Sequence, residues 1–158
     1  MRLRPLAPAD LAAVHTLWTD PGVSKYLWDD EVIPLGRAEA VLRDSEANFT
    51  AHGFGLWGAF LPDRGDLAGF CGFAFFGYPS QPELVFGLAP SHWGQGLATE
   101  LARAMIRHGF ETLGFHQIVV STDPGNVASQ RVMEKAGMTR DPSRRTDGIY
   151  YLIHKPSV

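Results

Sequence analysis

The sequence predicts a single α/β domain, and three observations lead to this prediction. The chain has 158 residues, which suits one domain because domains commonly contain about 100–200 residues. Along the chain, apolar residues alternate between the spacing of strands and the spacing of helices. No internal repeat or low-complexity tract interrupts this order, and the 17 Gly and 11 Pro stay below the level typical of disordered chains. We therefore expect one domain over residues 1–158.

The first half of the chain predicts a strand, two helices and an antiparallel hairpin. Pro8 fits the first turn of a helix, and Asp10 follows where the helix dipole favours an anion. Asp20-Pro21-Gly22 is expected to end that helix and to open a loop. The turn of the hairpin is predicted at residues 62–66. The expected elements are a strand over 1–6, a helix from residue 8 to this stop, a helix over 35–49, and strands over 54–61 and 67–78.

The second half predicts a strand, a long amphipathic helix, a buried strand, a helix and a last strand. Leu97, Leu101 and Met105 recur at helical spacing and form one apolar face. Gly137 fits the C-cap of the following helix. The expected ranges are strands over 83–88, 117–122 and 149–153, helices over 97–112 and 126–135, and one further short strand near 139–144.

Composition and charge exclude several classes of function. The formal net charge is −3, whereas a surface that follows nucleic-acid phosphates is expected to be basic. No stretch reaches the about 20 apolar residues of a membrane span, and Pro5 and Pro8 stand where a signal peptide would be apolar. The single Cys71 suits a reducing cytoplasm. One Cys and six scattered His predict no metal site. We expect no nucleic-acid or membrane partner.

A glycine pair marks the start of the long helix. Gly94 and Gly96 frame Gln95 between a strand and that helix, and backbone N–H groups at such a helix start can bind phosphate. Taken alone, a Gly-x-Gly more often forms only a tight corner. The known phosphate fingerprints do not match, because no Lys follows the glycines and Thr99 occupies the place of a third glycine.

Several motifs, in one order over nearly the whole chain, carry a resemblance to a known family. They are Arg2-Leu3-Arg4-Pro5-Leu6 with Pro8-Ala9-Asp10-Leu11, Trp18-Thr19-Asp20-Pro21, Gly69-Phe70-Cys71-Gly72-Phe73, Trp93-Gly94-Gln95-Gly96-Leu97-Ala98-Thr99-Glu100, Asp123-Pro124-Gly125-Asn126-Val127-Ala128-Ser129, and Lys135-Ala136-Gly137-Met138. In this set the chain resembles the GNAT N-acetyltransferases, and within them the ribosomal-protein N-terminal acetyltransferase (RimJ/RimL-type) branch. The resemblance implies the GNAT fold, with a central mixed, mostly antiparallel sheet of six to seven strands flanked by about four helices.

The resemblance also implies acetyl transfer from acetyl-CoA to a primary amine without a metal, by direct attack in a ternary complex. The strand edge is expected to pair with the pantetheine amides of CoA, and an N–H near Leu88 to stabilise the oxyanion. Asn126 is expected to bond the pantetheine arm, although a helix N-cap alone would also explain it. Ser129 is expected to protonate the leaving thiolate, against the alternative of a solvent-facing serine. The implied CoA-binding residues are Phe86, Gly87, Leu88, Gln95, Gly96, Leu97, Ala98, Thr99, Asn126 and Ser129.

The base and the acceptor contacts are less tightly specified. Glu83, entering a buried strand, is the first candidate for a general base, against an exposed strand-end carboxylate. At neutral pH about one α-amine in ten is already uncharged, so this short inventory of bases favours an α-amine or another amine of low pKa. Trp28, Asp29, Asp30 and Glu31 are candidates for acceptor binding, against a solvated charge run.

Departures from the family leave alternatives open. Many GNAT enzymes have a tyrosine general acid seven residues after the asparagine, where this chain has Met133. Trp93 replaces the Gln or Arg that often begins the loop, although Trp is common in this branch. The main alternative is therefore a non-catalytic acyl-CoA-binding sensor of the same fold. An adenine-nucleotide binder is a third, and the chain could be a monomer or a homodimer.

Overall fold

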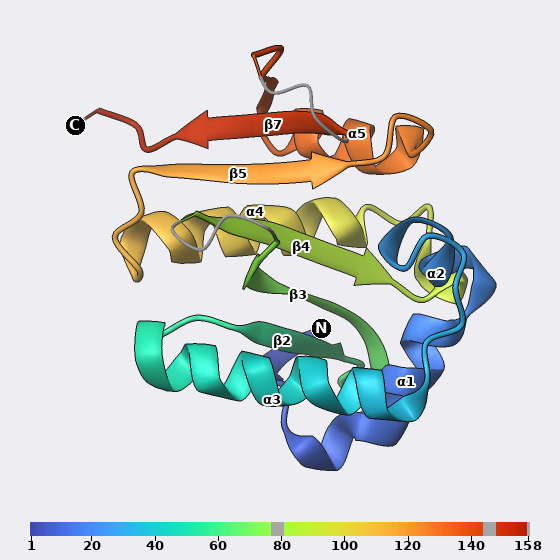
Figure 1. Cartoon of the computed structure of the whole chain (residues 1–158). Coiled ribbons are helices and arrows are strands. Elements are labelled where there is room, and N and C mark those ends of the chain that lie inside the picture. Colours follow the sequence, from blue (N-terminus) through green and yellow to red (C-terminus); the bar gives the residue numbers. More distant parts are fainter. Residues whose placement is uncertain (77–80, 144–147, 158) are drawn as a thin grey trace.

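A mixed sheet of seven strands forms the centre of the computed structural model, which describes residues 1–76, 81–143 and 148–157 (Figure 1). The strand order is β1-β2-β3-β4-β5-β7-β6, and every pair is antiparallel except β4 with β5. The predicted mixed, mostly antiparallel sheet is confirmed. The strands are β1 (Arg2–Pro5), β2 (Leu56–Phe60), β3 (Leu67–Phe75), β4 (Pro82–Leu88), β5 (Gln117–Thr122), β6 (Thr139–Arg140) and β7 (Ile149–His154).

The expected strands all form, with small shifts at their ends. The range 117–122 is reproduced as β5, and the short strand expected near 139–144 is β6. Two predicted ends, Tyr78 and Arg144, lie outside the described residues. The hairpin turn at 62–66 joins β2 to β3 as predicted.

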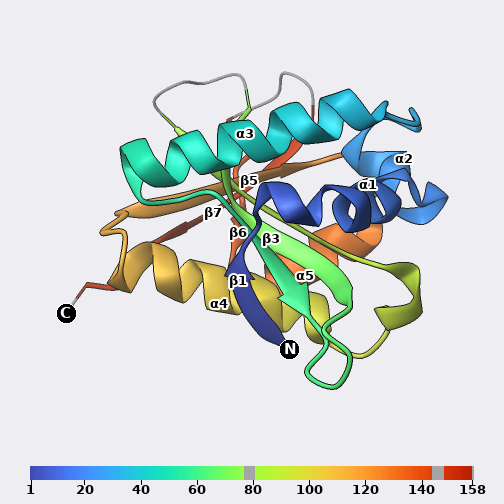
Figure 2. The same cartoon turned by 90° about the horizontal axis from the view of Figure 1, so that it is seen from below.

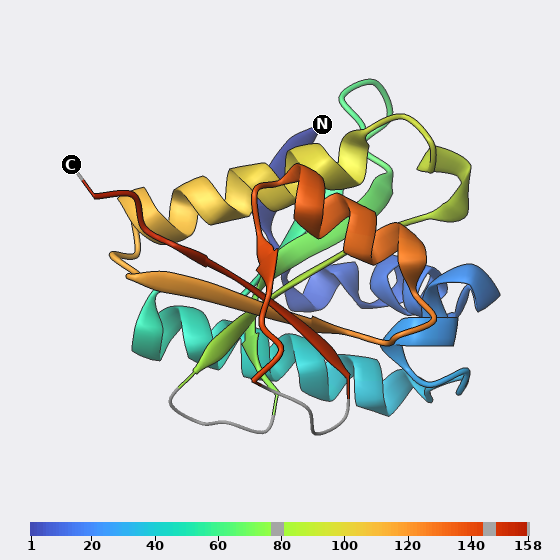
Figure 3. The same ribbon diagram turned by 90° about the horizontal axis from the view of Figure 1, so that it is seen from above.

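Helices cover both faces of the sheet. In the described part of the chain they are α1 (Leu11–Thr19), α2 (Pro21–Leu27), α3 (Leu35–His52), α4 (Leu97–Glu111) and α5 (Val127–Lys135), with 3-10 turns at Pro8–Asp10 and Pro90–His92. Figure 2 shows α1, α2 and α3 on one face and α4 and α5 on the other, and Figure 3 shows α4 beside α5. Among residues 1–76, 81–143 and 148–157, no helix combines the length and apolarity needed to cross a membrane.

Helix α2 corrects the prediction of a loop after residue 20. The Asp20 side chain accepts a hydrogen bond from the Gly22 N–H at 2.9 Å, and Pro21 occupies the first helical position. An aspartate N-cap followed by proline at N1 is a favourable helix start. Asp20-Pro21-Gly22 therefore ends α1 and begins α2, and the structure has five helices where about four were expected.

Two apolar cores hold the layers together. One lies between the sheet and α4 and α5 and includes Phe73, Met105 and Met133; the other lies between the sheet and α1 to α3 and includes Trp18 and Leu42. Burial of apolar side chains in such cores is the dominant favourable contribution to folding. Cys71 belongs to the first core, and burial raises the pKa of its thiol to about 12. Cys71 is therefore a core thiol.

A buried carboxylate joins β1 to the start of α1. The Arg4 guanidinium donates to both oxygens of Asp10 at 2.8 Å, and the Ala7 N–H donates to Oδ2 at 2.8 Å. These contacts, the Arg4 bond above all, lower the pKa of Asp10. Its carboxylate therefore stabilises the fold above the usual aspartate pKa of about 3.9, and this contribution is lost as the pH falls through the lower folded value.

We expect Asp10→Asn to lower the free energy of unfolding by about 1–2 kcal/mol at pH 7, since hydrogen bonds to charged groups contribute about 1.5–3 kcal/mol and the half-exposed Arg4 reduces this. Urea unfolding of both proteins at pH 7 and near pH 3 measures it, and the difference is expected to shrink at the lower pH. Glu39→Gln, in the exposed pair of Glu39 with Arg43, is the matched control. A difference that does not change with pH would contradict the ion-pair explanation.

Candidate active site

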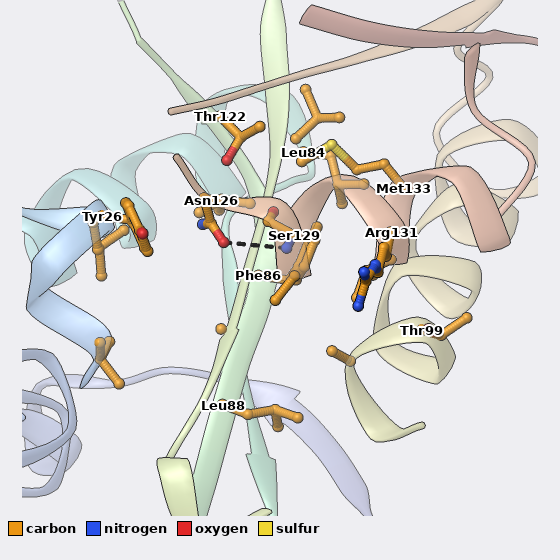
Figure 4. Close-up of a pocket in the computed structure, with 18 of the residues that line it drawn as sticks. Tyr26, Leu84, Phe86, Leu88, Thr99, Thr122, Asn126, Ser129, Arg131 and Met133 are labelled. Atoms are coloured by element: carbon orange, nitrogen blue, oxygen red, sulfur yellow. Dashed lines mark hydrogen bonds between the residues drawn. The ribbon is translucent and has the colours of Figure 1, made fainter. Parts of the chain in front are cut away.

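A cavity of about 770 Å³ opens where β4 and β5 separate, and it is lined from both faces of the sheet. Its walls come from α2, from the end of β4, from the start of α4 and from α5. Figure 4 shows Tyr26 of α2 on one side, Thr99 of α4 on the other, and Asn126 and Ser129 of α5 between them. The segments that the sequence analysis assigned to CoA binding therefore meet in one place.

The edge of β4 that faces this cavity carries backbone groups that no neighbouring strand pairs within the described residues. β4 is bridged to its parallel neighbour β5 only at Glu83 and Val119 within the described residues. The Ala89 N–H donates to Ala68 of the β3 side at 2.8 Å, and successive N–H groups of a strand point to opposite edges. The N–H and C=O of Phe86 and Leu88 therefore point away from β3. The indole of Trp93, which donates to the Leu88 carbonyl at 2.9 Å, supports this orientation.

The start of α4 presents N–H groups to the same cavity. Gly94 and Gly96 have left-handed φ values of 77° and 76°, and the first bond of the helix runs from the Glu100 N–H to the Gly96 carbonyl. The N–H groups of the first helical turn come before that bond and have no acceptor inside the helix. They also lie at the positive end of the helix dipole. This end of α4 can therefore bind an anion.

Asn126 and Ser129 stand together at the start of α5. The Asn126 Oδ1 accepts from the Ser129 N–H at 3.1 Å, which makes Asn126 the N-cap of the helix. The capping interpretation is confirmed, while the bond to pantetheine stays a prediction. Both side chains are half-buried and line the cavity. Within the described residues, no hydrogen bond occupies the Ser129 Oγ, so the hydroxyl is available to a bound substrate.

Glu83 lines the cavity at the point where β4 and β5 are bridged through Glu83 and Val119. It is 3% exposed, so the alternative of an exposed strand-end carboxylate is wrong. Its role as the general base stays a prediction.

Met133 also lines the cavity, one turn after Ser129 on α5, and is 1% exposed. Its thioether cannot donate a proton. The position where the family resemblance would place a tyrosine general acid is thus filled by an apolar side chain at the cavity wall. Within α5, Ser129 is the one residue with a side-chain hydroxyl.

Several cavity residues were missed by the sequence analysis. Val23, Tyr26 and Leu27 line it from α2, and the Tyr26 hydroxyl donates to the Gly125 carbonyl at 3.1 Å, which ties α2 to the loop before α5. The Asp20-Pro21 helix start could have predicted this wall. Arg131 and Lys135 of α5 also line the cavity and are exposed; their spacing of four residues on one helix face was the available signal.

Other predicted residues do not reach the cavity wall. Gln95 is exposed and lies outside it, although both flanking glycines line it. Trp28 packs its ring against Trp18 at 5.6 Å between centroids, and Arg37 covers it at 5.2 Å. The acidic residues that follow Trp28 are exposed and do not line the cavity either: Asp29, Asp30 and Glu31. Their part in acceptor binding stays a prediction.

A metal centre has no support in the described part of the chain, where no three His, Cys, Asp or Glu side chains gather into a possible ligand set. His108, the histidine on the apolar side of α4, packs edge-to-face on Trp57 at 5.6 Å. Burial lowers the pKa of His108, because it disfavours the charged imidazolium. It belongs to the packing of this region and does not line the cavity.

Comparison with known proteins is consistent with this geometry. The family model described as the acetyltransferase (GNAT) domain matches residues 1–139. The protein YkkB of Bacillus subtilis (strain 168) is 33% identical over 141 residues, covering 87% of this chain and 81% of YkkB. An acetyltransferase structure from Agrobacterium tumefaciens str. C58 is similar at a TM-score of 0.85 and 29% identity, covering 97% of this chain and 90% of that one.

Two further solved structures share the fold alone. Aminoglycoside acetyltransferase AAC(6')-Ib, in complex with coenzyme A and kanamycin, has a TM-score of 0.78 at 20% identity, with 97% and 94% of the two chains covered. The ribosomal L7/L12 acetyltransferase RimL, in complex with coenzyme A, has a TM-score of 0.77 at 17% identity, with 96% and 92% covered. Both proteins hold coenzyme A, and their acceptors differ.

Proposed function

The chain belongs to the GNAT acetyltransferase family, and from this premise we propose that it moves an acetyl group from acetyl-CoA directly to a primary amine while both are bound. The observation that carries the proposal is the open edge of β4 meeting the start of α4 in one cavity. Acetyl-CoA is thus the co-substrate. The coenzyme A complexes of AAC(6')-Ib and RimL, which share the fold, support this use of the cavity.

The chain's residues fit an elongated, phosphate-bearing thioester. The N–H groups near Gly96, Leu97, Ala98 and Thr99 would receive the pyrophosphate. The backbone edge at Phe86 would pair with the pantetheine amides as an added strand does, whereas the Leu88 C=O already accepts from the Trp93 indole. Gly87, between them, faces β3 in the ladder with Phe70. Arg131 and Lys135, exposed at the rim, would add attraction for the phosphates.

Three residues would carry the chemistry. The amine nitrogen attacks the thioester carbonyl carbon, and its proton passes to Glu83 through water. The N–H of Leu88 stabilises the oxyanion that forms on the carbonyl oxygen. When the C–S bond breaks, the thiolate takes a proton from the Ser129 hydroxyl, directly or through water. A water molecule returns a proton to the Ser129 oxygen and takes the proton held by Glu83, so both residues regain their starting states and the proton lost by the amine balances the proton gained by the thiol.

For the acceptor we propose an N-terminal α-amine of a protein or peptide, or a small amine of similar pKa. Two considerations support this choice. An α-amine titrates near 8 and a lysine side chain near 10.4, so an α-amine needs less help from a single buried carboxylate. The motif set around Gly94 and Asn126 also resembles the RimJ/RimL-type branch.

A non-catalytic acyl-CoA sensor is the second candidate, and Met133 favours it because no tyrosine acid is present there. Calorimetry with acetyl-CoA, CoA and ATP, combined with a thiol-release assay on a broad amine panel, separates the candidates. We expect acetyl-CoA to bind, ATP to bind much more weakly, and thiol to be released with at least one amine class. Binding without release would favour the sensor, and binding of ATP in place of acetyl-CoA would overturn both.

A further inference from the structure

The cavity divides into two halves that lie on opposite faces of the sheet. Side chains alternate along β4, so Leu84 and Leu88 pack in the core of α4 and α5, and Val85 packs with the core of α1 to α3. Under the proposed function, the half beside α4 and α5 holds the co-substrate. The half beside α2 is then left for the amine.

We name this second half the acceptor half and define it by Val23, Tyr26, Leu27, Phe70, Phe76, Glu83 and Val85, all of which line the cavity. Its walls are mostly apolar. Val23 and Phe70 are buried, Leu27 and Val85 are partly buried in the same core, and Phe76 is 51% exposed at the rim. The polar hydroxyl of Tyr26 is directed to the Gly125 carbonyl, so the ring contributes mainly apolar surface. The apolar part of a ligand would bind favourably here, because binding removes its surface from water.

Among the residues that the structure describes, two acids line the cavity. Glu83 lies in the acceptor half, and Asp123 is exposed, with its Oδ1 accepting from the Gly125 N–H at 2.7 Å. The acids of residues 29–31 lie outside the lining. Arg131 and Lys135, which also line the cavity, are positive. A ligand with several positive charges would have to remove water from each charge, and the described part of the cavity offers few carboxylates to replace that water. Such desolvation is costly.

From this combination we infer that the acceptor is a primary amine attached to an apolar or aromatic side chain and carrying a single positive charge. Polycations such as polyamines and aminoglycosides are poor acceptors. The inference rests on the proposed acetyl transfer and adds to it the class of amine. The α-amine of a large apolar residue, free or at a peptide N-terminus, meets this description.

The test is thiol release with purified protein and acetyl-CoA on a graded set of α-amino amides. Glycinamide, alaninamide, norvalinamide and norleucinamide differ in apolar length at nearly constant amine pKa. We expect kcat/KM to rise about threefold to fourfold per added methylene, the gain for moving such a group out of water, until the acceptor half is filled. Argininamide ends in a guanidinium that stays charged, and we expect at least a tenfold lower kcat/KM than for norleucinamide.

A variant pair tests the position of the contact. Leu27→Glu adds a second carboxylate to the acceptor half, and we expect it to lower the norleucinamide-to-argininamide ratio at least tenfold. Leu35→Glu makes the same change at an exposed residue outside the cavity and is expected to leave the ratio unchanged. Because both rates are measured on one preparation, the ratio does not depend on the folded fraction.

Different experimental results would overturn the inference about the acceptor and the proposed acetyl transfer. A flat amide series, or faster release with argininamide, spermidine or kanamycin than with norleucinamide, overturns the inference and leaves acetyl transfer standing. An unchanged ratio in Leu27→Glu also overturns it. The absence of release with every amine, although acetyl-CoA binds, overturns the proposed function itself.

Discussion

Replacement of Gly96 by aspartate is expected to lower the affinity for acetyl-CoA by about 100-fold. A Cβ added at Gly96 meets no atom within 4 Å, so the new carboxylate would project into the open space at the start of α4, where the pyrophosphate is proposed to bind. Two like charges about 4 Å apart near a protein surface repel by about 4 kcal/mol, and salt screens part of this. Since 1.4 kcal/mol corresponds to tenfold in affinity, calorimetric titration with acetyl-CoA can measure the loss directly.

Two controls separate charge from backbone strain. Gly65 has a similar φ of 71° and equally open surroundings, but it lies in the turn between β2 and β3, so Gly65→Asp is expected to leave binding unchanged. Gly96→Ala places a Cβ at the same left-handed position without a charge and is expected to cost less than Gly96→Asp. Equal affinity of wild-type protein and Gly96→Asp would mean that the phosphates bind elsewhere.

Ser129→Ala is expected to lower kcat at least tenfold with little change in acetyl-CoA affinity. The loss would come from the proton needed by the leaving thiolate, a step to which a positioned acid commonly contributes about 10²–10⁴-fold. Because the Asn126 cap accepts from the backbone N–H of residue 129 and not from its side chain, the substitution leaves the helix start intact. Steady-state thiol release and calorimetry on the same variant measure the two quantities.

The matched control for Ser129→Ala is Ser91→Ala, at an exposed serine in the 3-10 turn Pro90–His92 outside the cavity. It should behave as wild type in both measurements. If kcat of Ser129→Ala equals that of the wild-type protein across the pH range, Ser129 has no part in the chemistry, and water or another group protonates the thiolate. A parallel loss of acetyl-CoA affinity would instead assign Ser129 to binding.

The parts of the fold with strong local signals could be predicted from the sequence. The buried strand β5 and the amphipathic helix α4 were placed to within one residue, because consecutive apolar residues or one apolar face defined them. Helix α2 was missed although Asp20 and Pro21 carry its start, because Gly22 next to them also fits a turn. Seven residues are too few for helical periodicity to overrule that choice.

The site shows the same division between contiguous and distant residues. Segments such as Gly94 to Thr99, or Asn126 with Ser129, could be named in advance because the family resemblance rests on motifs that are contiguous in the chain. That Tyr26 contacts Gly125 could not be predicted, since the two residues are 99 positions apart. The packing of the Trp28 ring against Trp18 could not be predicted from the sequence either.

The sequence by itself determined the order of the strands and of every helix except α2, the family resemblance and the loop suited to phosphate, because these depend on neighbouring residues and on local backbone preferences. Only the tertiary structure decided that β4 separates from β5 after Glu83, that Glu83 is buried there, and that α2 closes the cavity with apolar side chains. The physical reason is that strand pairing and burial depend on contacts between distant segments, whose partners no local pattern specifies. Most residues of the proposed co-substrate half could thus be named from the chain, whereas most residues of the proposed acceptor half could be named only from the folded structure.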